Sequence, residues 1–364
     1  MAETIHFGEK FRTALAKYFA AQSVTDHAFN HNIDAEFSGS DTVHIYEIAT
    51  SDLNNYNKSV DPSTGSRFGN VVEVGDHRYT FKLTQDVSLD RAVDRGNNDA
   101  VFNIKKAGAI MKAYIDKVIR PFKDKYRLEK WCAEAGIHIA LDSAPTKTSI
   151  VEQIIDLHNA MIEEGVPENE GTLYIARNQL KYLKLASEWV GLDSLGGKSL
   201  PKGTVGMFDG LIVQPVASRL FPANCYFSIF VKDSIIAPEK INTFRGIKDS
   251  ENMDGDRLQY RCKFDAFVMP SLAAGAAVAC AKGAVTALPT VSSAAISGDD
   301  KNVKVTVSSA EGAVYYTLDG SDPRYASADA KVYSAAVTVA KGNTFRCCAK
   351  AEGKYHSAVV TNKV

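Results

Sequence analysis

Three short segments of this 364-residue chain carry residue types that could do chemistry, and each departs from the full pattern which that chemistry requires. GLDSLGGKS, residues 191–199, resembles a phosphate-binding loop, but its first glycine lies one residue too far from Lys198 for the G-x-x-x-x-G-K-[ST] pattern. His27 and His31 stand four residues apart, as metal ligands on a helix do, yet no carboxylate lies between them. The acidic run 249–256 lacks the spacing of a calcium loop.

The rest of the chain contains no G-x-S-x-G elbow, no H-E-x-x-H pair and no G-x-G-x-x-G loop. We therefore predict that the protein is not an enzyme and has no cofactor or metal. The cysteines show no C-x-x-C pair, which argues against zinc and thioredoxin-like chemistry, and we expect all of them to be reduced thiols. They stand at positions 132, 225, 262, 280, 347 and 348.

Composition limits the class of protein. A hydrophobic fraction of 45% and a charged fraction of 23% are typical of globular proteins, and 364 residues favour two or three domains. A net charge of −1 argues against binding that depends on neutralising many phosphates. The N-terminus lacks the pattern of a signal peptide, so we expect synthesis in a cytoplasm. The apolar stretch 266–281 is too short and too rich in Ala and Gly for a membrane span.

The sequence of the N-terminal third predicts helical and extended elements that need another surface to pack on. Apolar residues at helical spacing indicate an amphipathic helix over 8–22, and alternation indicates strands at 42–48 and 78–84. Between these strands, 49–70 is almost free of aliphatic side chains. Loops of this length tend to be functional or to be stabilised by contact with a partner, so we expect an extended arm.

Helical periodicity then runs over 101–135, far longer than an average helix, with a kink expected at Pro121 and an end at Gly136. Further helices are expected at 148–164, 178–190 and, as a short one, 233–241. Strands are expected at 172–176, 203–207, 210–216, 225–231 and 258–268. Beyond a linker near 283–289, short strands between Ser, Gly and Asp turns are typical of a small β-sandwich.

This order of elements over residues 1–282 resembles the major capsid protein fold of tailed bacteriophages. The resemblance rests on the arm, the two-stranded loop, the long "spine" helix, the glycine-punctuated segment GTVGMFDGLIVQPV and the final long strand. Asp86, Asp90 and Asp94 look like the acidic approach to the spine helix. The implied fold class is α+β, a capsid-type fold followed by an all-β immunoglobulin-like sandwich. The implied domains are 1–36 (N-terminal arm), 37–85 (extended β-loop), 86–190 (peripheral domain with spine helix), 191–257 (axial domain), 258–284 (return strands of the peripheral domain) and 285–364 (C-terminal domain).

Residues 290–364 resemble the immunoglobulin-like module at the C-terminus of chitobiases and other bacterial surface proteins. The motif is AVYYTLDGSDPRYAS, residues 313–327, in which Asp319, Gly320, Asp322 and Pro323 suit tight turns. The resemblance implies display on the outside of a particle, where Tyr325, Tyr333 and Tyr355 would meet a surface or a glycan. A passive, stiffening domain is the equal alternative.

Together the resemblances imply a major capsid protein that assembles with itself into hexamers and pentamers of an icosahedral shell around double-stranded DNA. Portal, scaffolding and decoration proteins would be further partners, the packaged DNA would be contacted non-specifically, and no membrane would be involved. The protein would reside in the virion after assembly in the host cytoplasm. Lys58 and Arg67 are the expected intersubunit contacts of the 49–70 loop.

Two other classes of protein stay open. The C-terminal module often accompanies a secreted or surface carbohydrate-active enzyme or adhesin, although such a protein should carry a signal peptide. A bacterial nanocompartment shell shares the fold and would hold protein instead of DNA.

Overall fold

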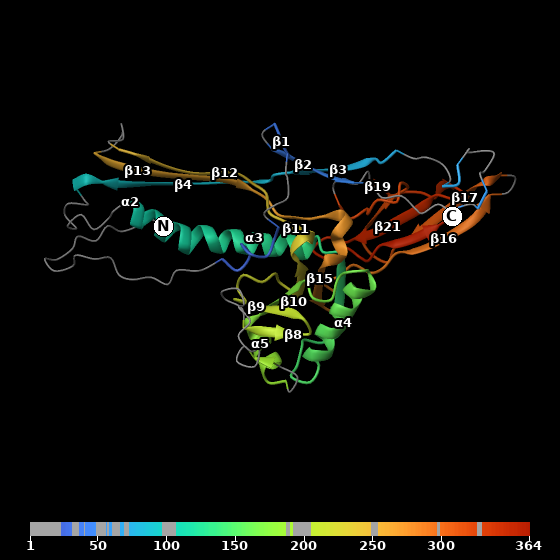
Figure 1. Cartoon of the computed structure of the whole chain (residues 1–364), viewed down its shortest axis with the longest axis horizontal. Coiled ribbons are helices and arrows are strands. Elements are labelled where there is room, and N and C mark those ends of the chain that lie inside the picture. Colours follow the sequence, from blue (N-terminus) through green and yellow to red (C-terminus); the bar gives the residue numbers. More distant parts are fainter. Residues whose placement is uncertain are drawn as a thin grey trace.

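A computed structural model describes most of the chain, as an elongated molecule with three parts (Figure 1). A long sheet and a long helix run side by side, a compact α/β part lies below them, and a β-rich unit forms the other end. The described residues are 23–30, 36–39, 41–48, 56, 58, 59, 66–68, 73–96, 107–186, 190, 191, 205–248, 254–296, 299–325 and 330–364. No helix among them is both long enough and apolar enough to cross a membrane.

The α/β part is built on a seven-stranded sheet, the central sheet. In spatial order its strands are β5 (Ile137–Leu141), β15 (Ala276–Ala281), β10 (Cys225–Val231), β6 (Gly171–Ala176), β9 (Leu211–Val216), β8 (Gly206–Phe208) and β7 (Val190–Gly191). Alternate residues of its strands point to opposite faces, and both faces are covered. Leu173 and Ile175 pack with the buried face of α4 (Ile150–Glu163) and with α5 (Arg177–Lys184), whereas Tyr174 packs on the other face.

The tight turn between β8 and β9 shows why the chain needs Asp and Gly there. Asp209 and Gly210 have φ values of 48° and 75° and join Phe208 to Leu211 in a two-residue hairpin. Positive φ at both central residues is the geometry that Asp-Gly accepts readily. The carboxylate of Asp209 lies 2.7 Å from Nδ1 of His158, which ties this turn to α4.

The long helix is continuous over α2 (Ala107–Tyr114), a π-helical turn η1 (Ile115–Ile119) and α3 (Arg120–Ala133). Pro121 lies in the first turn of α3, directly after the π turn. A proline inside a helix removes one backbone donor and its ring needs extra room, which a wider turn provides. The helix ends before Gly136 as expected, and the turn before Pro121 is π-helical, while the kink expected at Pro121 stays a prediction. The expected start at 101 lies outside the described residues.

The long sheet runs along this helix (Figure 1) and contains β12 (Glu239–Ile247), β13 (Gly255–Phe264) and β4 (Gln85–Asp94) in that order. One face of the sheet is apolar and packs on the helix, because Tyr260, Cys262 and Phe264 alternate with polar neighbours. The side chains that meet them from the helix include Met111, with Ile115 and Ile119 partly buried.

A smaller antiparallel sheet, the hairpin sheet, consists of β1 (Glu36–Ser38), β2 (Thr42–Ile48) and β3 (Asp76–Lys82). Val43, Ile45 and Phe81 form its buried face, and Phe81 stacks on Phe267 with ring centroids 4.6 Å apart. Phe267 belongs to the short strand pair β11 (Ile235–Ile236) and β14 (Phe267–Val268). The short helical turns η3 (Lys232–Ser234) and η4 (Pro270–Gly275) flank this pair.

The C-terminal unit consists of two antiparallel sheets around its own apolar cluster, which includes Val305, Val339 and Phe345. One sheet has the order β16 (Thr290–Ile296), β17 (Asp299–Ser308), β20 (Val337–Ala340), and the other the order β19 (Lys331–Val332), β18 (Ala313–Thr317), β21 (Thr344–Lys350), β22 (Val360–Lys363). Residues 282–289 join this unit to β15, where the linker was expected.

The structure corrects several expectations. The border expected between 190 and 191 is wrong, because β6, assigned to the peripheral domain, pairs in parallel with β9 of the axial segment, so one sheet spans the border. The strands assigned together to 258–284 separate, since β13 joins the long sheet and β15 the central sheet. The short helix expected at 233–241 is a 3-10 turn followed by strands, and the helix expected to reach 190 ends at Lys184.

Candidate assembly surfaces

The 49–70 loop presents two aromatic rings to solvent. Tyr56 and Phe68 are 57% and 74% exposed, and their ring centroids lie 5.0 Å apart in an edge-to-face arrangement. Lys58 and Arg67, the two residues expected to contact a neighbouring subunit, are both exposed beside these rings. An exposed aromatic pair flanked by cations is a surface that a partner can bury. Most of the loop lies outside the described residues.

Residues 23–25, the first that the structure describes, are hydrogen-bonded to the long helix. Asp124 is 2% exposed, and its carboxylate accepts hydrogen bonds from Ser23 Oγ (2.6 Å), Val24 N (3.1 Å) and Thr25 Oγ1 (2.6 Å). Arg127, also buried, donates to Thr25 Oγ1 at 3.1 Å. The start of the described part of the predicted arm 1–36 is therefore held on α3. The helix expected over 8–22 lies outside the described residues.

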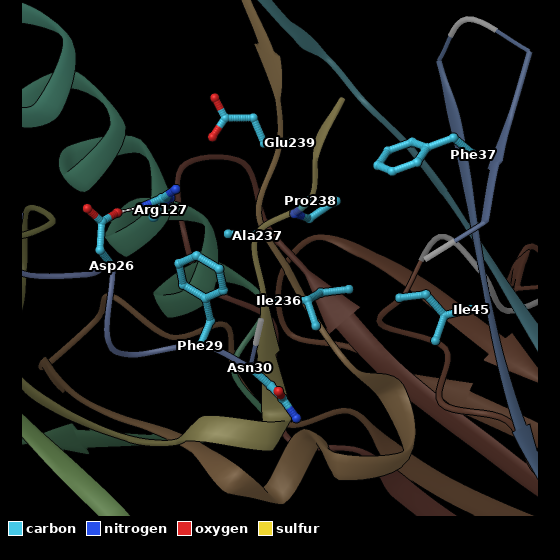
Figure 2. Close-up of a pocket in the computed structure, with 10 residues that line it drawn as sticks. All are labelled: Asp26, Phe29, Asn30, Phe37, Ile45, Arg127, Ile236, Ala237, Pro238 and Glu239. Atoms are coloured by element: carbon cyan, nitrogen blue, oxygen red, sulfur yellow. Dashed lines mark hydrogen bonds and ion pairs between the residues drawn. The ribbon is translucent and has the colours of Figure 1, made fainter. Parts of the chain in front are cut away.

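A notch of about 330 Å³ opens between this anchor, the segment 236–239 and the hairpin sheet (Figure 2). Phe29 and Ile236 line it on one side, and Phe37 and Ile45 face them from the hairpin sheet. The charged groups on its rim are engaged with other parts of the chain, since Arg127 pairs with Asp26 at 2.6 Å and Glu239 with Lys123 at 2.7 Å. The notch is thus apolar with a neutralised rim, which suits side-chain packing better than acid/base chemistry.

The outer face of the long sheet carries ion pairs. Asp90 accepts two hydrogen bonds from Arg257 Nε at 2.9 Å and one from Gln259 at 3.0 Å, and Asp86 pairs with Arg261. The hydrogen bonds from Arg257 and then Gln259 lower the pKa of Asp90 to about 2. Asp86 and Asp90, expected as an acidic approach to the helix, are in fact strand residues whose partners lie on β13, some 170 positions away.

The C-terminal unit is docked on the body through Arg324, Tyr325 and Tyr355. Tyr325 is 5% exposed, and its hydroxyl donates to the carbonyl of Glu134 at the end of α3 (2.8 Å). Arg324 pairs with Asp322 and donates to the carbonyl of Gly136. The ring of Tyr355 stacks on His138, with centroids 5.0 Å apart.

Burial at this junction shifts three titrating groups. It raises the pKa of Glu134 to about 7, against the opposing effect of Lys130. It lowers the pKa of His138 and of His356 to about 4, and the positive charge of Lys350 and Arg324 adds to the effect on His356. Both histidines are therefore neutral at pH 7, which suits a packed junction.

These placements correct the expected outer surface of the C-terminal unit. Tyr325 and Tyr355 lie between the unit and the body, and the Tyr333 hydroxyl accepts a hydrogen bond from Val307 N (3.0 Å) inside the unit. Tyr325 is buried and so does not face an outside ligand, whereas Tyr333 and Tyr355 are partly buried by these contacts. The AVYYTLDGSDPRYAS motif gave no signal of this, because an aromatic residue after a turn can point to either side.

The sequence patterns that could do chemistry find little support in the described part of the chain. No group of three or more His, Cys, Asp or Glu side chains there could hold a metal ion. All six cysteines are free and buried. Residues 192–199, His31 and 249–253 lie outside the described residues, whereas Asp254 pairs with Arg95 at 3.1 Å. The described residues instead form exposed surfaces and a packed contact between the C-terminal unit and the body.

Comparison with solved structures identifies the fold. Over 75% of its length the chain resembles a structure from Mycobacterium phage Che8, with a TM-score of 0.51 and 17% identity over 96% of that chain. It resembles the capsid of cyanophage P-SCSP1u with a TM-score of 0.57 and 10% identity, covering 76% of this chain and 93% of that one. The mature capsid of bacteriophage PhiM1 matches with a TM-score of 0.54 and 14% identity, covering 76% and 92%.

The expected capsid-type fold is thereby confirmed for about three quarters of the chain. Residues 303–364 match a different family, described as Fn3 associated. That match covers most of the C-terminal unit, while the assignment to a chitobiase-type immunoglobulin-like module stays a prediction. No curated protein matches the chain.

Proposed function

We propose that this protein is the major capsid protein of a tailed double-stranded DNA bacteriophage and that it assembles with itself into an icosahedral shell. The observation that carries the proposal is the fold, since the structures of similar fold include phage capsids that match over more than nine tenths of their own length. The protein would act in the virion, after assembly in the host cytoplasm. Function would reside in interfaces and not in a catalytic centre.

The shape of the chain supports this role. The hairpin sheet leads into the 49–70 loop, which carries the exposed rings of Tyr56 and Phe68. Exposed aromatic rings of this kind are groups that a neighbouring subunit would bury. In this proposal Lys58 and Arg67 contact the neighbouring subunit within hexamers and pentamers.

The C-terminal unit would be carried on the outer surface of the shell. Its own apolar core and short linker suit an added unit, and its docking on α3 suits a stiffening role. A ligand on the outside, such as a glycan, would need residues other than Tyr325. Portal, scaffolding and decoration proteins, and packaged DNA, would be the remaining partners.

Deletion of residues 49–70 tests the loop. We expect a folded protein, with the circular dichroism spectrum and thermal transition of the body retained, that forms no particles by electron microscopy. Tyr56→Ser with Phe68→Ser should reduce assembly in the same direction. Val332→Ser is the matched control, because it removes a 60% exposed apolar side chain from the C-terminal unit and should leave assembly unchanged. Intact shells from the deletion variant would refute the role of the loop.

A further inference from the structure

Three thiols meet beneath the C-terminal unit. Cys225 begins β10, Cys280 lies opposite it on β15, and Cys132 comes from α3. All three belong to the apolar cluster that joins the central sheet to α3 and to Tyr325 of the C-terminal unit. The sulfur atoms of Cys225 and Cys280 lie 3.9 Å apart.

The backbone around Cys225 and Cys280 has the geometry that a disulfide requires. The two residues are direct partners in an antiparallel pair, beside a β-bulge between Cys225 and Phe227, and the flanking hydrogen bond from Ala281 N to Asn224 O (2.7 Å) makes theirs a non-hydrogen-bonded pair. Side chains approach most closely at such positions, where the Cα atoms are about 4.5 Å apart. Disulfides span Cα distances of about 4.4 to 6.8 Å, so little backbone movement is needed.

The surroundings favour reaction at Cys225. The Cys132 thiol and the contact between the Cys225 and Cys280 sulfur atoms lower the pKa of the Cys225 thiol, and the same contact raises the pKa of Cys280. Cys225 is therefore the thiol that ionises first, and the thiolate is the nucleophile in thiol–disulfide exchange. The hydroxyl of Tyr355 lies 3.1 Å from Cys225 Sγ, so the C-terminal unit covers the sulfur from outside. Cys225 is 8% exposed, while Cys132 and Cys280 are fully buried. A reagent would therefore reach Cys225 first.

We propose that Cys225 and Cys280 form an oxidation site, which a small-molecule disulfide converts into a cross-strand disulfide. The Cys225 thiolate attacks one sulfur of the reagent, forms a mixed disulfide and releases one small thiol. The Cys280 thiolate then attacks Cys225 Sγ and releases the second. Two protein thiols are oxidised and one small disulfide is reduced to two thiols, which take up the two protons.

The bond would link β10 and β15 of the central sheet beside Tyr355. It would join two residues that are 55 positions apart in the chain, and such closure stabilises a fold by limiting the conformations of the unfolded chain. The timing of this step rests on the proposed function. A cytoplasm keeps thiols reduced, whereas a virion released by lysis meets an oxidising medium. The disulfide would therefore form after the shell has assembled.

The test treats the full-length protein, in whatever assembly state it is purified, with oxidised glutathione, and maps the thiols by alkylation and peptide mass spectrometry. We expect loss of two of the six thiols, a peptide pair linked through Cys225 and Cys280, and a higher melting temperature that a reductant reverses. Cys225→Ser and Cys280→Ser should each abolish the gain in melting temperature. Cys262→Ser, in the long sheet, is the matched control and should retain it.

Three results would overturn the inference: a glutathione adduct on Cys225 that persists, a disulfide that uses Cys132 or another cysteine in place of this pair, or six unreacted thiols in folded protein after prolonged exposure. The peptide map of the unmutated protein decides between them even if a variant fails to fold. Failure of the protein to form shells would count against the proposed function and would leave the chemistry of this pair intact.

Discussion

At the scale of single residues, the side chains that matter most are those the sequence could not place. Arg324 and Tyr325 follow a predicted turn, and nothing in their spacing shows that they reach Gly136 and Glu134, almost 190 positions earlier. Lys58 and Arg67 are exposed as the loop assignment requires, and their contact with a neighbour stays a prediction.

Glu134 gives a prediction about pH. Its pKa is about 7 in the folded protein against an ordinary value of 4.5, so between these values the folded state holds an extra proton and stability falls as the pH rises. Glu134→Gln removes this penalty. Relative to the unmutated protein, the variant should gain roughly 1 to 3 kcal/mol of unfolding free energy between pH 5 and pH 8.

The measurement is chemical denaturation across this pH range. Glu129→Gln, on the exposed side of the same helix, is the control and should show no such gain. A difference between Glu134→Gln and the unmutated protein that stays flat with pH would contradict the assignment of Glu134 as a buried, partly protonated acid.

At the scale of elements, the local sequence pattern predicted the position of many strands and helices but little of how the strands pair. Alternation of apolar and polar side chains placed β2 and β13 within a few residues, because one face of each packs and the period is two. The order of the central sheet was not accessible, since β15 pairs with β5, and Ala277 faces Ile137 across 140 positions. The strand β12 was read partly as a helix, because its short apolar run has no clear period.

Close packing in the long sheet gives a prediction at this scale. A Cβ atom on Gly255 would lie 2.1 Å from the carbonyl oxygen of Val93, so β13 and β4 would have to separate locally. Gly255→Ala should lower the unfolding free energy by roughly 1 to 3 kcal/mol. Gly246→Ala is the matched control, because its Cβ would meet nothing nearer than 4.0 Å. Equal stability of the two variants would show that the strands do not approach as closely as described.

At the scale of the whole molecule, the C-terminal unit and the body act as one packed object. Tyr325 belongs to the same apolar cluster as Trp131 and Tyr174, although the unit also has its own core. The composition shift near 283–289 revealed the boundary between them but gave no sign of the contact across it. A C-terminal unit that is held by such specific contacts is better suited to stiffening the body than to moving independently on a linker.

Removing the contact made by Tyr325 should release the C-terminal unit from the body. Tyr325→Ala deletes a buried ring and its bond to Glu134, and we expect a loss of roughly 3 kcal/mol in unfolding free energy, together with faster proteolysis in the linker 283–289. Val332→Ala, exposed on the same unit, should change neither property. Unchanged linker cleavage in Tyr325→Ala would mean that other contacts hold the unit in place.

The central claim is that this chain completes its structure by joining copies of itself in a closed shell. Electron microscopy of the purified full-length protein, with sedimentation velocity over a range of concentrations, tests it most directly. We expect hollow particles of uniform size with icosahedral symmetry, in which the 49–70 loop lies against a neighbouring subunit. A compact monomer that persists at high concentration and never forms particles would contradict the account.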